Sequence, residues 1–128
     1  QLGGAEAATT RADAFWHSIR EQTHVFFAGD LPVWRVAVPS TAAALPVRCP
    51  QLIEWGGALR WLRTDQSADQ VREIATKAGG HATLFRGGDR SNGVFTPLAP
   101  TLATIHRRLK ARFDPAGIFN PGRLYPDL

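Results

Sequence analysis

Apolar residues recur along this chain with two different periods. Spacings of three and four residues predict helices, whereas runs rich in β-branched and aromatic residues predict strands. Gly and Pro separate these segments. The sequence therefore predicts the order helix, strand, strand, strand, helix, strand, helix. The expected ranges are 10–22, 33–38, 51–55, 58–63, 67–78 and 81–86, followed by a last helix that begins near Pro97 or Pro100 and ends at Phe113.

Several helix ends and one hairpin turn can be recognised from the residues at their boundaries. Thr10 is a plausible N-cap of the first helix, whose expected apolar face holds Ala12, Phe15, Trp16 and Ile19. Ser67 and Gln70 form a capping box for the second helix. Gly79-Gly80 predicts the end of that helix, because glycine readily adopts the left-handed conformation of a C-cap. Gly56-Gly57 predicts a tight two-residue hairpin turn, because glycine adopts positive φ readily.

The last helix combines an apolar face with a basic one. Spacings of four, three, four and four predict a buried face made of Leu98, Leu102, Ile105, Leu109 and Phe113. The opposite surface carries a cluster without acidic residues: Arg107, Arg108, Lys110 and Arg112. Such a cluster can bind nucleic acid or another anionic partner, but a solvated helix face is the favoured interpretation.

The order of elements predicts an α+β domain, an antiparallel sheet with helices on one face. Most of it matches the split βαββαβ pattern of ferredoxin-like folds, with a first strand that would precede residue 1. A sheet without that strand would keep an unpaired edge. The length of 128 residues fits one domain, 1–128, because two separate cores would each be small.

Composition narrows the classes of function. The net charge is +4, and 44% of the residues are hydrophobic, which favours a folded core. No apolar run is long enough for a membrane span, and no signal peptide is visible. The sequence contains no Met, which indicates a processed product or a segment of a longer reading frame. Cys49 is alone and is expected to be buried and inert.

Common catalytic and cofactor motifs are absent from the sequence. The glycine pairs lack the spacing of dinucleotide- or phosphate-binding loops. The four His residues are scattered without metal-ligand spacing, so no metal site is expected. No catalytic residue is assigned.

The residues after the last helix are the hardest to explain by a purely structural role. Residues 113–123 combine two prolines and two glycines with large apolar residues. Asn120 offers a hydrogen-bond donor and acceptor, and Arg123 offers a bidentate cation, where the backbone is stiffened. This segment either fixes the end of the last helix to the domain or lies against a polar or anionic surface of another body.

Residues 109–123, which read LKARFDPAGIFNPGR, resemble the C-terminal signature of FAD-linked oxidases of the vanillyl-alcohol oxidase type. Within that family, the stretches around Trp34-Arg35, residues 53–62 and residues 78–83 are similar to flavin-binding subunits of glycolate oxidases. The resemblance runs in order from about residue 30 to residue 126.

The resemblance implies that the chain is a C-terminal cap, or substrate, domain whose FAD-binding domain lies outside residues 1–128. It implies FAD in the parent protein, bound mainly by that N-terminal domain, and none in this fragment. The expected partners are that FAD domain and the other glycolate oxidase subunits, a second flavin subunit (D) and an iron–sulfur subunit. The expected location is the cytoplasm, with peripheral attachment to the inner membrane through the complex as an alternative.

Residue assignments follow from the same resemblance. Asn120, Pro121, Gly122 and Arg123 are expected near the flavin domain as cofactor-binding residues. Arg35 is a candidate for binding a substrate carboxylate in a pocket on the sheet, or else an ordinary solvent-facing strand residue.

One departure from the family leaves two roles open. The chain lacks the GDGN-x-H run that contributes to the substrate site in related oxidases, and residues 88–93 hold some of its letters in another order. The parent subunit therefore either oxidises a 2-hydroxy acid such as glycolate or supports and relays electrons from a catalytic subunit, while the fragment alone is expected to be inactive. A non-enzymatic ferredoxin-like module that binds a partner or small ligand is the alternative from a different class.

Overall fold

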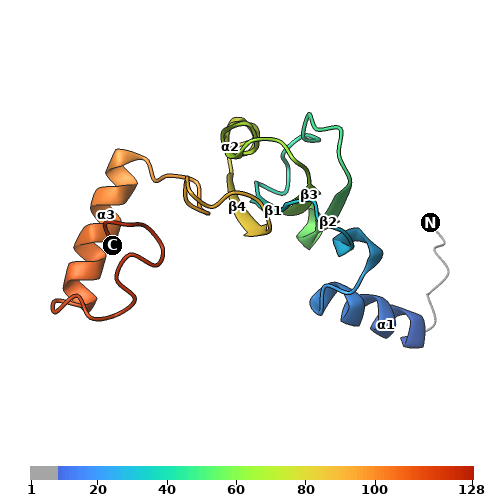
Figure 1. Ribbon diagram of the computed structural model, residues 1–128, viewed down its shortest axis with the longest axis horizontal. Helices are drawn as coiled ribbons and strands as arrows, with labels where there is room; N and C mark the ends of the chain where they lie inside the picture. The colour runs from blue at the N-terminus through green and yellow to red at the C-terminus, as the bar shows by residue number, and fades with distance from the viewer. Residues whose placement is uncertain (1–8) are drawn as a thin grey trace.

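A four-stranded antiparallel sheet forms the centre of the molecule, in the order β2-β3-β1-β4. The computed structural model describes residues 9–128, with side chains from residue 11 onward. The helices and strands are α1 (Thr9–Arg20), β1 (Val33–Ala37), β2 (Gln51–Glu54), β3 (Leu59–Arg63), α2 (Ala68–Lys77), β4 (His81–Arg86) and α3 (Pro100–Phe113). Two short 3₁₀ turns, η1 (Val25–Phe27) and η2 (Trp55–Gly57), complete the fold (Figure 1). The predicted order of elements is confirmed.

The strand order corrects one expectation. Each pair of neighbouring strands is antiparallel, so β1 and β2 run parallel with β3 between them, and β3 and β4 run parallel with β1 between them. Each parallel pair with a strand between them is a split βαβ-type unit, and two such units interleave in the ferredoxin-like pattern. All four strands of that pattern are therefore present in the described residues. A first strand before residue 1 is therefore not needed to complete the pattern. The reason is that β1 is itself the first strand, and the irregular connection 38–50 replaces the helix expected after it.

Apolar side chains cover both faces of the sheet. One cluster joins Trp34, Val36 and Leu62 to α2 and to Leu45 of the 38–50 connection. A second cluster, built on the alternate strand residues Val33 and Trp61, packs against η1 and the end of α1. Its buried members are Ile19, Phe26, Phe27, Val33, Leu59 and Trp61. The α+β class is thus confirmed, while α2 is the helix that lies on the first face and α1 reaches the other through Ile19.

A buried arginine holds the 38–50 connection in place. Arg60 is 5% exposed, and its guanidinium donates to the carbonyl oxygens of Gly57 at 3.1 Å, Ala43 at 2.7 Å and Ala42 at 2.7 Å. A buried cation is tolerated only when its donors are satisfied. Arg60 therefore ties the hairpin to a connection whose structure the sequence alone leaves undetermined.

Helix α2 begins and ends as predicted. The Ser67 hydroxyl accepts from the Gln70 backbone N–H, and the Gln70 side chain accepts from the Ser67 backbone N–H, which completes the capping box. At the other end, Gly79 has a φ of 78°. The N–H groups of Gly79 and Gly80 donate to the carbonyls of Thr76 and Ala75, which is the Schellman arrangement.

The hairpin turn is longer than predicted. Glu54 pairs with Leu59, so four residues, rather than two, connect β2 and β3. Trp55, Gly56 and Gly57 have φ values of 52°, 59° and 94°, so the left-handed region begins at a tryptophan. Positive φ is unusual for a bulky residue.

The two end helices expose apolar faces that were expected to be buried. Thr10 lies inside α1, so its predicted N-cap role is wrong, and Ile19 is the buried residue of the predicted face, since Phe15 and Trp16 are 44% and 58% exposed. In α3 the correction is larger. Leu98 is half-buried, but the other four residues are exposed, from 44% at Leu102 to 78% at Phe113.

The reason is the position of α3. Figure 1 shows α3 beyond the sheet on the side of β4, with the C-terminal tail folded against it. No side chain of α3 is buried. We call Leu102, Ile105, Leu109 and Phe113 the α3 apolar face.

Gly80 is predicted to be irreplaceable for packing. A Cβ at this position would lie 1.9 Å from the Ala37 carbonyl oxygen. Gly80→Ala should therefore lower the free energy of unfolding by at least about 2 kcal/mol in chemical denaturation.

Gly93→Ala is the control, because a Cβ there meets nothing within 4 Å although φ is 73°. The strain of a positive φ alone should lower the free energy of unfolding by about 1–2 kcal/mol. Equal losses for the two variants would contradict the steric explanation.

Candidate functional site

The C-terminal tail is held against α3 and the connector that precedes it. Asp127 accepts from Nε and one terminal nitrogen of Arg107, at 2.8 and 2.6 Å. The Tyr125 hydroxyl donates to the Thr96 carbonyl at 3.0 Å, and its ring lies 6.0 Å from that of Phe95. The tail is therefore a folded part of the domain, as expected for a segment that fixes the last helix.

Asp114 is the residue that turns the chain at the end of α3. It is 7% exposed, and its carboxylate accepts from the backbone N–H groups of Ile118 and Phe119 at 3.0 and 2.9 Å. The Lys110 ammonium lies 2.8 Å from the same carboxylate and also donates to the Phe119 carbonyl. Gly117, at a φ of 63°, allows the turn to close.

These contacts lower the pKa of Asp114. The largest cause is the hydrogen bond from Lys110, burial acts in the opposite direction, and the N–H groups of Phe119 and Ile118 add to the lowering. The signature stretch after the last helix is thus built around one carboxylate that stays ionised at neutral pH.

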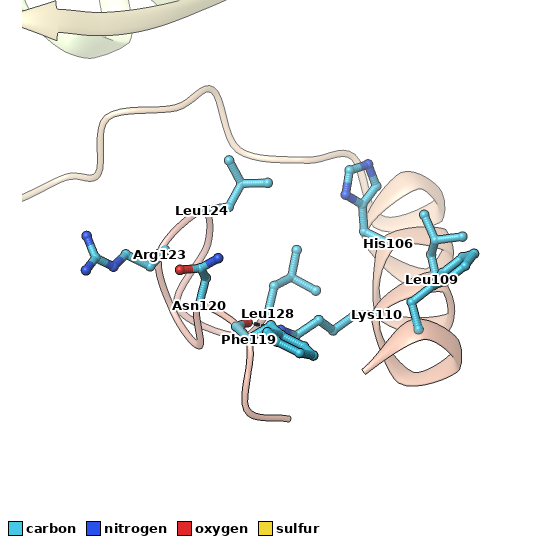
Figure 2. Close-up of a pocket in the computed structure, with 9 residues that line it drawn as sticks. His106, Leu109, Lys110, Phe119, Asn120, Arg123, Leu124 and Leu128 are labelled. Carbon is cyan, nitrogen blue, oxygen red and sulfur yellow. Dashed lines mark hydrogen bonds between the residues drawn. The ribbon is translucent and has the colours of Figure 1, made fainter. Parts of the chain in front are cut away.

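A pocket of about 310 Å³ lies between α3 and the tail (Figure 2). Its lining residues are largely apolar: His106, Leu109, Lys110, Phe113, Phe119, Asn120, Arg123, Leu124 and Leu128. Of the predicted cofactor-binding residues, the structure brings Asn120 and Arg123 to this pocket. Pro121 and Gly122 instead form the turn between them, with Gly122 at a φ of 67° and its N–H donating to the Leu128 carbonyl at 2.6 Å.

The charged side chains of α3 are all basic. Helix α3 contains His106, Arg107, Arg108, Lys110 and Arg112 and no acidic residue. Within the described residues Arg107 pairs with Asp127 and Lys110 with Asp114, whereas no ion pair is found for Arg123. In Figure 2 the Arg123 side chain points away from α3, so its guanidinium is available to a body outside this chain.

A second pocket, of about 580 Å³, lies between the sheet and the start of α3. Arg35, half-buried on β1, lines it together with His81 and Thr83 of β4, and Thr83 is the cross-strand neighbour of Arg35. Among residues 11–128, no hydrogen bond or ion pair to the Arg35 guanidinium is found. Arg35 therefore lines a pocket on the sheet, and its role as a substrate contact stays a prediction. Arg35 and Arg123 line different pockets.

Sequence reasoning missed the residues that complete these pockets. His81, Thr83 and Tyr125 join Arg35 only because β4 lies beside β1 and the tail returns to the connector. Asp114 is not among the residues that the sequence analysis singles out, yet an Asp followed by Pro-x-Gly is a signal for a side chain that accepts from later backbone N–H groups.

Other candidate chemistry is limited. No group of three or more potential metal ligands occurs in the described part of the chain. Cys49 is half-buried, not fully buried as expected, and its partial burial raises the pKa of the thiol. None of the described helices is long and apolar enough to cross a membrane. The 88–93 loop serves the scaffold, because Asp89 accepts from Ser91 and the buried Arg72 donates to the carbonyls of Asn92 and Gly93.

Comparison with known proteins agrees with the signature in the tail. Residues 60–124, which include most of β3, all of α2, β4 and α3, and most of the tail, match the model of the C-terminal domain of FAD-linked oxidases. The chain belongs to this family. It is also 46% identical over 127 residues to the Glycolate oxidase subunit GlcE of Escherichia coli (strain K12). That match spans 99% of the chain but 34% of the relative. No solved structure matches the chain.

The Asp114 turn generates a prediction that depends on pH. Because the folded-state pKa lies below the ordinary value of about 3.9, the stabilisation by the ionised carboxylate is complete above about pH 4. It is lost as the pH falls through the lowered pKa. Hydrogen exchange at the Ile118 and Phe119 amides, corrected for intrinsic rates, should therefore accelerate only in strong acid.

Asp114→Asn removes the charge and nearly preserves the shape. Exchange at the same amides should rise several-fold at neutral pH and lose its dependence on acid. Asp127→Asn, which removes an exposed ion pair with Arg107, is the matched control and should leave these two amides protected. Unchanged protection in Asp114→Asn would refute the role of the carboxylate.

Proposed function

We propose that this chain is the C-terminal cap domain of a glycolate oxidase flavin subunit, part of an FAD-dependent enzyme that oxidises a 2-hydroxy acid to the 2-oxo acid. The observation that carries the proposal is the α3 apolar face with the folded tail beside it. Four large apolar residues lie in water on a helix whose family signature belongs to FAD-linked oxidases. Burying such a face requires a second body.

That second body is the FAD-binding domain of the parent protein. The chain spans 34% of the length of its GlcE relative, which leaves room for a further domain in the parent. Exposed apolar surface of this extent on one helix marks an interaction site. On this proposal residues 1–128 form one cap domain and are inactive alone.

The residues of the tail fit a contact at the edge of FAD or of its domain. A pocket of about 310 Å³ with mostly apolar lining is too small to enclose a dinucleotide, whereas one outward guanidinium suits a phosphate or carboxylate oxygen. Arg123 would supply this contact directly, Asn120 would hydrogen-bond beside it, and Pro121 and Gly122 would fix the turn that presents them. FAD, when bound by the parent, supplies the acceptor for the substrate's hydride.

Arg35 is the candidate for the substrate carboxylate. Its half-buried guanidinium lacks a partner in the described residues and lines the sheet pocket, and a charge-assisted bidentate bond to a carboxylate would satisfy it. The Thr83 hydroxyl and the His81 ring on the neighbouring strand lie along the same pocket and can orient the rest of a small hydroxy acid.

Two roles of the parent subunit fit these contacts. In the first it binds and oxidises the 2-hydroxy acid. In the second it supports a catalytic subunit or relays its electrons, a role favoured by the use of the 88–93 loop as scaffold. Either role implies assembly with the other oxidase subunits, a second flavin subunit and an iron–sulfur subunit, in the cytoplasm or at the inner membrane through the complex.

Arg123→Ala in the full-length parent should lower the amount of flavin retained after purification, because the proposed contact to the cofactor or its domain is lost. Flavin content is read from the absorbance spectrum against protein concentration. Arg90→Ala, at an exposed arginine of the 88–93 loop, is the matched control and should retain the wild-type flavin content. Equal flavin in the Arg123 variant and the wild type would remove the support for Arg123 as a cofactor contact.

Arg35→Ala tests the substrate site. Loss of a charge-assisted hydrogen-bond pair should raise KM for glycolate by roughly tenfold to a hundredfold while flavin content stays unchanged. Arg48→Ala, an exposed arginine on the 38–50 connection, should leave KM at its wild-type value. If KM does not move in the Arg35 variant, the subunit does not bind glycolate through this pocket, and the supporting role is favoured.

A further inference from the structure

The pocket that Arg35 lines contains few groups that can exchange a proton. We call this pocket, of about 580 Å³ between the sheet and the start of α3, the Arg35 pocket. The titratable side chains among its lining residues are those of Arg35, His81 and Tyr125. Arginine stays protonated in proteins, so Arg35 can hold a carboxylate but cannot take up a proton.

Tyr125 is engaged in a structural bond. Its hydroxyl donates to the Thr96 carbonyl at 3.0 Å, and burial raises the pKa of the phenol. A tyrosine must lose its own proton before it can accept another, and both the bond and the burial oppose that loss. Histidine, in contrast, binds and releases a proton near neutral pH. Among the described residues that line the pocket, His81 is therefore the one suited to accept a proton.

The His81 side chain is available to a ligand. It is exposed, and no hydrogen bond or ion pair to its ring is found among residues 11–128. Its cross-strand neighbour on β1 is Ala37, whose small side chain leaves space beside the imidazole. The ring therefore bonds to nothing in the described part of the chain, although it lines a pocket together with Arg35.

The backbone is held on both sides of His81. Before it, Gly80 lies so close to β1 that a Cβ on this residue would come within 1.9 Å of the Ala37 carbonyl oxygen. After it, the Thr96 hydroxyl accepts from the Ala82 N–H and donates to the Ala82 carbonyl, both at 2.9 Å. These contacts fix the start of β4 between β1 and the connector to α3. A catalytic group needs such a fixed position relative to its substrate.

His81 and Arg35 lie on the same face of the sheet. Arg35 pairs with Thr83 and Ala37 pairs with His81, and alternate residues of a strand share a face. His81 is therefore a diagonal neighbour of Arg35, and such neighbours lie about 7–8 Å apart across two strands. A 2-hydroxy acid carries its hydroxyl on the carbon next to its carboxylate. A molecule of this size fits between the two side chains, with the carboxylate at Arg35 and the hydroxyl at His81.

We propose that His81 is the general base that deprotonates the hydroxyl of a 2-hydroxy acid held by Arg35. The hydroxyl proton passes to an imidazole nitrogen, and the electrons of the O–H bond form the second bond of the new C=O group. The C–H bond of the same carbon breaks, and its electron pair leaves with the hydrogen as a hydride to an oxidised flavin. The imidazolium then releases its proton to solvent.

This inference rests on the proposed function and deepens the first of its two roles, in which the parent subunit oxidises the hydroxy acid. The position of the pocket supports it. Leu102 lines the Arg35 pocket and also belongs to the α3 apolar face, so the pocket opens beside the surface on which the proposed flavin half docks.

Oxalate binding to the full-length parent tests the proton transfer without turnover. Oxalate carries negative oxygens on two adjacent carbons, as the deprotonated hydroxy acid does, and it has no hydride to give. Its binding at mildly alkaline pH should draw about one proton onto His81. Calorimetry in buffers of different ionisation enthalpy measures this uptake. His81→Gln should bind oxalate without proton uptake, whereas His17→Gln, at an exposed histidine of α1, should behave like the wild type.

Flavin reduction by glycolate in a single turnover gives the second readout. In His81→Gln its rate should fall roughly 10²- to 10⁴-fold, while KM for glycolate and flavin content stay near their wild-type values. The melting temperature should also be unchanged, because the His81 side chain is exposed. Added imidazole should restore part of the rate in His81→Ala, and His17→Gln should reduce flavin at the wild-type rate.

Either of two results would overturn the role of His81. One is proton uptake on oxalate binding that persists in His81→Gln, and the other is an unchanged rate of flavin reduction in that variant. Failure of the proposed function has a different signature. A wild-type parent that binds no oxalate and shows no flavin reduction by glycolate would contradict the proposed oxidation itself, and the role of His81 with it.

Discussion

Large apolar side chains on one face of a helix are stable only when another surface removes them from water. In α3 that surface is absent from the described residues, although Leu102, Ile105, Leu109 and Phe113 follow a regular helical spacing. Burying each of these side chains would contribute roughly 1.5–3 kcal/mol. The position of α3 beyond the sheet, the fold of the tail and the outward direction of Arg123 are all consistent with a domain whose second half lies elsewhere.

Polar bonds hold the irregular segments of the domain against the sheet. Buried or half-buried arginines donate to loop carbonyls: Arg60 to the 38–50 connection, Arg63 to the Phe26 carbonyl at 3.1 Å, and Arg72 to the 88–93 loop. None of these three arginines has a carboxylate partner in the described part of the chain. Their donors are used to hold irregular segments against the sheet. These bonds hold the irregular segments in place around the sheet that carries Arg35.

Local signals in the sequence predicted the elements well. Ser67 and Gln70 bracket the start of α2, Gly79 ends it, and runs of β-branched and aromatic residues mark β1 and β3. The prediction failed where a residue's role depends on distant partners. The spacing of the α3 apolar face indicates a buried helix, but it cannot say which surface covers that helix. Likewise, β1 was not recognised as the first strand because an irregular connection, held by Arg60, replaces a helix. The Arg35 pocket was expected, but its other residues come together only through strand order and the return of the tail.

Hydroxyl-radical footprinting of Phe113 tests the central claim most directly, because its side chain is 78% exposed in this domain. The oxidation rate at Phe113 should be compared between residues 1–128 alone and the full-length parent. The account predicts rapid oxidation in the isolated domain and strong protection in the parent, where the flavin half covers the α3 apolar face. Equal oxidation rates in the two proteins would contradict it.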